Sequence, residues 1–229
     1  MTLPGIALVF AVLISPKVFA AIPDDCQGKN YRPDVVPENM SVIEKKRRFR
    51  CLVQVDIEAV YSELKTEYRL VLTAVQQNSD NEKLRLLRLK YGVESNRDLL
   101  VAIKPHPQSI AIAQAAIESA WGTSRIFTEA NNIFGIRPFK SGEPMISANN
   151  KRGDKVVWLR KYANVRESVA DYYLVLGRAA AYKEFRTLKM KTSDPHMLVM
   201  KLNNYSERKG EYVRELSAMI RYNNFHELD

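Results

Sequence analysis

The chain has 229 residues, of which 46% are hydrophobic and 27% are charged, and this balance supplies a packed core and argues against global disorder. The length suits one domain, or one domain with an extension. The formal net charge of +9 favours polyanionic partners such as nucleic acid, anionic lipid or an acidic wall polymer, and charge by itself does not choose among them.

The N-terminus predicts an export signal. Residues 6–14 form an uninterrupted apolar run that is too short to span a bilayer and is typical of a signal-peptide core, although no Lys or Arg precedes it. Residues 18–20 (VFA) predict cleavage after Ala20. The alternative is a short buried strand or helix. We therefore expect secretion across the inner membrane into the periplasm, with no stable membrane span after cleavage.

Cys26 and Cys51 are the two cysteines of the chain. An exported chain folds in an oxidising compartment, where an even count permits one disulfide that would tie the N-terminal arm to the first helix. Two unpaired buried thiols are the alternative. The three histidines, at positions 106, 196 and 226, lie far apart and near no cysteine, so neither a metal site nor a cofactor is expected.

An arm and three helices are predicted next. Residues 21–38 carry three prolines and are predicted to be extended. Residues 39–76 place apolar side chains at spacings of three and four, which predicts a long helix. Its basic stretch at 44–50 (EKKRRFR) is interpreted as a solvated helix face, with a nucleic-acid site as the alternative. Further helices are expected at 81–90 and, after a capping-box pattern at Ser95 and Asp98, up to Ile103.

The rest of the chain predicts more helices around a small β-lobe. A buried helix is expected at 107–120 and a short one at 124–129. Turn signals at 131–132, 141–142 and 149–150, with apolar runs at 133–136 and 156–159, predict a small antiparallel sheet. Helices follow at 166–180, 182–190, 195–204 and 209–222. The expected class is therefore α+β, mostly helical, with a cleft beside the β-lobe that suits a polymer strand.

Glu118 is the residue most unlike its surroundings. Ala111, Gln114 and Ala115 lie on its own helix face, and their small or uncharged side chains leave space around the carboxyl. Such surroundings disfavour the charged form, so the carboxyl should keep its proton towards neutral pH, as a general acid for a glycosidic oxygen must. The alternative is a Glu at a helix end that simply reaches solvent. Trp121 beside it is a candidate platform for a sugar.

Four motifs in order resemble the glucosaminidase family, glycoside hydrolase family seventy-three. Residues 113–122 (AQAAIESAWG) resemble its AQAALESGWG signature, and residues 132–136 (NIFGI) resemble its NLFGIK stretch. Residues 159–162 (LRKY) and 167–172 (ESVADY) resemble its FRxY and ESxxDY segments. Residues 204–206 (NYS) with Tyr212 resemble its closing element. Together the motifs cover about residues 95–222, and the extra helical N-terminus resembles the Bax-type branch of Gram-negative bacteria.

The resemblance implies a lysozyme-like fold and hydrolysis of the β-1,4 bond after N-acetylglucosamine in peptidoglycan. Together with the signal peptide predicted at 1–20, it divides the chain into an N-terminal arm and helical extension at 21–94 and a catalytic domain at 95–229. Glycan strands would be the partner and nucleic acid would not, and the resemblance names no protein partner.

The same resemblance makes Glu118 the catalytic acid. It makes Tyr205 a catalytic residue that steadies an N-acetyl group or the attacking water, with a core tyrosine as the alternative. Asn132 and Phe134 match the family's cleft floor, with a turn-forming side chain and core packing as their alternatives. Gln114 and Trp121 complete the candidate substrate-binding set.

The second carboxylate is where the resemblance fails. Many relatives carry an acidic residue shortly before the FRxY segment, whereas residues 148–153 (ANNKRG) hold none. Asp154 and Glu143 are the two candidate bases, and an inverting mechanism would need the carboxyls roughly 6.5–9.5 Å apart. A turn role for Asp154, assistance from the substrate's own acetamido group and loss of activity stay open. A lytic transglycosylase or muramidase using the same acid, and a non-catalytic peptidoglycan-binding protein, are the alternative functions.

Overall fold

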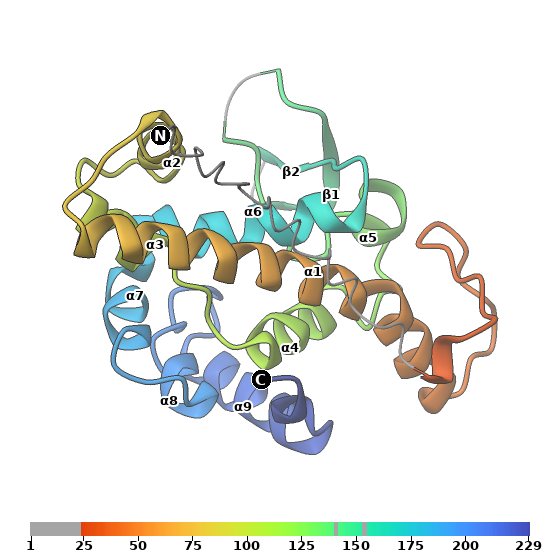
Figure 1. Cartoon of the computed structure of the whole chain (residues 1–229). Coiled ribbons are helices and arrows are strands. Elements are labelled where there is room, and N and C mark those ends of the chain that lie inside the picture. The colour runs from red at the N-terminus through yellow and green to blue at the C-terminus, as the bar shows by residue number, and fades with distance from the viewer. Residues whose placement is uncertain (1–23, 140–141, 153–154) are drawn as a thin grey trace, which may run out of the picture.

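The computed structural model describes residues 24–139, 142–152 and 155–229. The expected α+β class is confirmed, because helices dominate and one two-stranded sheet lies at an edge of the molecule (Figure 1). The helices are α1 (Val42–Gln76), α2 (Glu82–Tyr91), α3 (Asn96–Ile103), α4 (Gln108–Glu118), α5 (Arg125–Ala130), α6 (Val165–Arg178), α7 (Lys183–Lys189), α8 (Pro195–Val199) and α9 (Gly210–Tyr222). The strands are β1 (Met145–Arg152) and β2 (Lys155–Arg160), and the 3-10 helices are η1 (Asp24–Cys26), η2 (Ala180–Tyr182) and η3 (Phe225–Leu228).

Helix α1 begins where the sequence provides a capping box. The Ser41 hydroxyl accepts the backbone N–H of Glu44, and the Glu44 carboxylate accepts the backbone N–H of Ser41. Two N–H groups that a helix start leaves open are satisfied in this way. The buried side of α1, which includes Val53 and Ile57, packs against α3, α4 and α6. The helical N-terminal segment therefore shares one hydrophobic core with the rest of the described chain.

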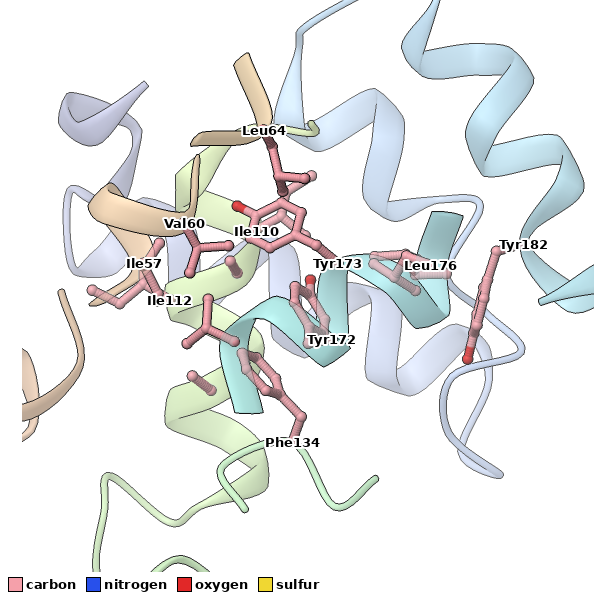
Figure 2. Close-up of a cluster of buried hydrophobic side chains, with 14 of the residues drawn as sticks. Ile57, Val60, Leu64, Ile110, Ile112, Phe134, Tyr172, Tyr173, Leu176 and Tyr182 are labelled. Carbon is pink, nitrogen blue, oxygen red and sulfur yellow. The ribbon is translucent and has the colours of Figure 1, made fainter. Parts of the chain in front are cut away.

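Helix α4 occupies the centre of that core. Each of its residues from Gln108 to Ala116 is buried. Figure 2 shows Ile110 and Ile112 of α4 between side chains of α1 and the ring of Tyr172 on α6. A helix that is apolar on all sides is stable only when other elements surround it. This packing fixes where the C-terminal residue of α4, Glu118, emerges.

The β-lobe differs from the prediction in its first strand, whereas β2 lies at the predicted apolar run 156–159. Residues 133–136 form a buried loop, because the Asn132 side chain bonds both the N–H and the C=O of Ile136, and Gly135 has a φ of 67°. The first strand is β1, which runs through residues 149–150 where a turn was expected. Antiparallel pairing matches Met145 with Arg160, and the register shifts between Ser147 and Lys151. The asparagines thus fall in an irregular strand.

Two helices end earlier than predicted. Helix α8 stops at Val199, whereas the apolar pattern predicted a helix to residue 204. Helix α4 stops at Glu118, because Ala120, Trp121 and Gly122 take left-handed backbone angles, with φ of 52°, 60° and 72°. The earlier end of α4 puts the Glu118 side chain on the last helical residue.

The N-terminal arm is fastened to α1 in the structure. Cys26 and Cys51 form a disulfide that joins η1 to the third turn of α1. The expected signal peptide at 1–20 lies outside the described residues. Among the residues that are described, none of the helices combines the length and the apolar character needed to cross a membrane.

Candidate functional site

Glu118 sits at the junction between the buried helix α4 and solvent. Its side chain is partly exposed, and burial raises the pKa of its carboxyl above the ordinary value. A hydrogen bond from Tyr212 and the positive charge of Arg208 oppose this rise, and the negative charge of Glu215 adds to it. Arg208 and Glu215 form an ion pair of 2.6 Å, so their effects on Glu118 partly cancel. Burial therefore has the largest effect on the pKa of the Glu118 carboxyl.

A chain of buried hydrogen bonds orients this carboxyl. The Tyr172 hydroxyl donates to the Oε1 of Gln114 over 2.6 Å, and the Nε2 of Gln114 donates to the Tyr212 hydroxyl over 2.9 Å. The Tyr212 hydroxyl in turn hydrogen-bonds to the Glu118 carboxyl. Because Gln114 fixes which way the Tyr212 proton points, the hydroxyl acts as a donor to Glu118. The rotamer of the carboxyl is thus set from the protein interior.

Tyr205 belongs to the same aromatic group. Its ring stacks on Tyr212 at a centroid distance of 5.7 Å and an angle of 8°, and its hydroxyl donates to the backbone carbonyl of Phe134 over 3.2 Å. Burial raises the pKa of Tyr205, with further contributions from Tyr212 and Glu118, so the hydroxyl stays protonated. The structure therefore brings Tyr205 and Glu118 into one electrostatic neighbourhood.

Three of the candidate substrate-binding residues lie in the interior. Gln114 is fully buried, Asn132 is 2% exposed and Phe134 is 3% exposed. The ring of Phe134 stacks on Tyr172 at 4.0 Å (Figure 2), and the amide of Asn132 closes the loop to Ile136. We interpret all three as groups that hold the site in place, since their polar atoms or rings are occupied by protein partners.

The turn after Glu118 is closed by backbone and side-chain hydrogen bonds. Ala120 and Trp121 are left-handed without being glycine, and this conformation costs roughly 1–2 kcal/mol per residue. The Ser119 hydroxyl donates to the carbonyl of Ala115 and accepts the N–H of Gly122. A Cβ at Gly122 would lie 3.3 Å from the Phe127 ring, so the glycine also permits close packing. The strain is held directly beside the candidate acid.

Arg48 links this turn to the N-terminal arm. Its side chain is 1% exposed, and Nη1 donates to the carbonyl of Gly122 over 2.7 Å. Its Nη2 donates to the carbonyls of Arg32, Pro33 and Val35. Part of the predicted solvated face at 44–50 is therefore buried, because the Arg48 guanidinium donates to four backbone carbonyls in the interior.

Of the two candidate bases, Glu143 and Asp154, the structure describes only Glu143. Glu143 accepts the N–H of Phe139 over 3.0 Å, and its carboxylate lies 3.6 Å from the Nε of Arg160. Arg160 also pairs with Asp171 at 2.7 Å. Glu143 is thus engaged in holding the β-lobe to α6. The other candidate, Asp154, lies outside the described residues.

A metal site is not supported by the described part of the chain. The one group of potential ligands found there comprises Asp25, Cys26 and Cys51, and the two cysteines are joined to each other as a disulfide. Disulfide sulfurs are not thiolates and do not act as the usual metal ligands.

Several members of the site were not identified as functional from sequence. Spacing of four placed Gln114 on the face of Glu118, but Tyr172, Arg208 and Glu215 come from segments 54 to 97 residues away, and no local pattern connects them to the acid. The ESxxDY and closing motifs contain Tyr172 and Tyr212, and were the signal that could have found them.

Comparisons with known proteins find a family model and several relatives that match this chain. Residues 100–225 match the family model for glucosaminidase, described as mannosyl-glycoprotein endo-beta-N-acetylglucosaminidase. Protein bax of Escherichia coli (strain K12) is 31% identical over 131 residues, 55% of this chain and 46% of that protein. Exo-glucosaminidase LytG of Bacillus subtilis (strain 168) is 32% identical over 81 residues, 33% of this chain and 29% of that protein.

Among solved structures, the catalytic domain of the autolysin Auto from Listeria monocytogenes aligns with a TM-score of 0.47 and 20% identity, covering 66% of this chain and 90% of that one. The matched segment spans less than half the length of protein bax and of LytG. The family model covers more than half of this chain and includes the helix of Glu118, the loop of Asn132 and the helix of Tyr212. The chain therefore belongs to the glucosaminidase family.

Proposed function

We propose that this protein is a peptidoglycan hydrolase that cleaves the β-1,4 bond after N-acetylglucosamine, with Glu118 as general acid. The observation that carries the proposal is a carboxyl whose pKa is raised by burial, on the last residue of a buried helix that matches the family signature. A carboxyl that keeps its proton can transfer it to the glycosidic oxygen as the bond breaks. Tyr212 aims it, and Tyr205 offers a hydroxyl for an N-acetyl group or the attacking water.

The activation of water is the open half of this mechanism. Asp154 and Glu143 are the two carboxylates proposed for it, and the ion pair of Glu143 with Arg160 favours Asp154. Assistance by the acetamido group of the substrate would need neither. No metal or cofactor takes part in the proposed chemistry.

The proposed site of action is the periplasm. Peptidoglycan lies outside the inner membrane, residues 1–20 have the pattern of a signal peptide, and a disulfide between Cys26 and Cys51 is typical of an oxidising compartment. In this proposal residues 21–94 form the arm and helical extension, and residues 95–229 the catalytic domain.

Mass spectrometry of muropeptides released from purified sacculi tests the reaction. Reducing N-acetylglucosamine ends are expected, and they should be missing from digests with Glu118→Gln. Anhydro ends would instead identify a lytic transglycosylase, and reducing N-acetylmuramic acid ends a muramidase. Sacculi that pellet with the protein but release nothing would identify a non-catalytic wall-binding protein.

A further inference from the structure

A hollow of about 250 Å³ lies where the first turns of α1 meet the C-terminal end of the chain. Three basic residues, Lys46, Arg47 and Arg50, line it together with the rings of Trp121 and Phe225. The remaining lining residues are Asp25, Ile43 and Asn223. The hollow thus combines a positive wall with an apolar one.

Trp121 forms the apolar wall. Its indole meets Phe49 edge-on at 5.3 Å and Phe225 at 6.2 Å, and the Lys46 ammonium lies 5.0 Å from the ring centroid. These ring contacts are with α1 and η3, whereas the carboxyl of Glu118 is bonded to Tyr212 on α9. The left-handed turn after Glu118 therefore directs the Trp121 ring toward α1 and η3, whereas the Glu118 carboxyl contacts α9.

The basic residues of the wall are only partly neutralised by protein partners. The Lys46 ammonium donates to the Asn223 amide over 2.7 Å, and the Nε of Arg50 donates to Gln54 over 3.2 Å. Within the described residues, the Arg47 guanidinium forms neither a hydrogen bond nor a salt bridge. Asp25 is the one acid among the described lining residues, and Glu44, outside the lining, interacts electrostatically with Arg47, so the wall keeps a net positive charge.

The chemistry of the hollow selects a small anion with an aliphatic part. Guanidinium groups bind carboxylates through paired N–H donors, and an indole face accepts the hydrocarbon of an amino acid. The volume is below the roughly 300–1,000 Å³ of clefts that enclose drug-sized ligands, so it suits one or two residues of a peptide. Binding of a polyphosphate chain relies on a longer series of cations than three.

We propose that this hollow binds a carboxylate-bearing peptide, and specifically the stem peptide that branches from peptidoglycan glycan strands. The identity of that peptide rests on the proposed function, since the stem is carried by the same polymer that Glu118 would cut.

The fluorescence of Trp121 reports binding directly. The chain has two tryptophans, so Trp158→Phe leaves Trp121 as its single indole. Titration of this variant with the tripeptide L-alanyl-γ-D-glutamyl-L-lysine should give a saturable change in emission as the carboxylates approach Lys46 and the indole. The same tripeptide with every carboxylate converted to a carboxamide should give none. Inorganic phosphate that reproduced the peptide's change would overturn the assignment to a peptide.

Two matched pairs of substitutions in the Trp158→Phe background separate the hollow from general surface charge. Arg47→Ala with Arg50→Ala removes two cations from the hollow, and the dissociation constant should rise about tenfold or more. Lys65→Ala with Arg69→Ala removes two cations from an exposed part of the same helix, and should leave the constant unchanged. Equal weakening by both pairs, or no saturable signal at all, would refute the proposal.

The binding assay needs no turnover, so the two proposals fail separately. Release of fragments from sacculi without a tripeptide signal would reject the peptide site and keep the hydrolase. A saturable tripeptide signal in a protein that releases no fragments would keep the peptide site and reject the hydrolase.

Discussion

The surroundings of Glu118 and the β-lobe are built in opposite ways. Around Glu118, the fully buried amide of Gln114 and the hydroxyls of Tyr172 and Tyr212 orient one carboxyl from inside the core. On the β-lobe, Trp158 is 47% and Val156 is 43% exposed, and Glu143 is engaged in an ion pair near the surface. The difference teaches that the core orients one carboxyl and raises its pKa by burial, whereas side chains of the lobe face solvent.

Glu118→Gln is expected to have the largest effect. Loss of a general acid typically lowers the rate by 10²–10⁴-fold, and kcat on sacculi should fall by about that factor. Glu94→Gln is the control at an exposed carboxylate outside the site, and it should keep most activity. If the Glu118→Gln protein stayed active, the buried carboxyl would not be the general acid.

The same substitution should not destabilise the fold. Because burial raises the pKa of Glu118, the folded state binds its proton more tightly than the unfolded state, and that stabilisation is lost as pH rises through the raised pKa. Gln cannot lose a proton, so the melting temperature of the variant relative to wild type should increase from acidic to neutral pH. A relative decrease over that range would contradict the raised pKa.

Tyr212→Phe is expected to shift the pH profile. The Tyr212 hydrogen bond lowers the pKa of Glu118, so its removal should move the alkaline limb of kcat/KM to higher pH. It also leaves the Nε2 of Gln114 without its acceptor in the core, at a cost of about 1–3 kcal/mol in unfolding free energy. Tyr222→Phe, at a tyrosine that is 82% exposed, should change neither quantity. A limb that moved to lower pH would show that Tyr212 does not stabilise the carboxylate.

Glu143→Gln should have a smaller effect on the rate than Glu118→Gln. Glu143 pairs with Arg160 and accepts the N–H of Phe139, so we expect it to support the lobe and its loss to lower kcat by less than about tenfold. Asp154→Asn assayed beside it tests the other candidate base. A loss of 10²-fold or more at Glu143 would instead identify Glu143 as the base.

Rising ionic strength should have the smallest effect, and mainly on KM. Salt screens exposed charges beyond about 8 Å at 0.15 M, so the attraction between a chain of net charge +9 and an acidic wall polymer should weaken several-fold. The buried hydrogen bonds of Glu118 are shielded from salt, so kcat should change little. Turnover that stayed flat or rose from low to high salt would argue that the basic surface plays no part.

Most helices were predictable because they depend on local patterns. The apolar stripe of α1, the cap at Ser95 and the small-residue run of α4 are each patterns within one segment, and the structure has these helices close to where they were expected. The β-lobe was less predictable, because apolar residues at 133–136 are equally compatible with a strand and with a buried loop until Asn132 is seen to bond Ile136.

The sequence by itself determined the α+β class and singled out Glu118, because an acidic residue within an apolar helix and the four family motifs are both features of local order along the chain. Only the tertiary structure decided that Tyr172, Gln114 and Tyr212 form one hydrogen-bonded path to that carboxyl, and that Trp121 faces Lys46. These contacts join residues 58 to 98 positions apart on different helices, and their direction depends on how helices pack, which spacing along one helix does not encode.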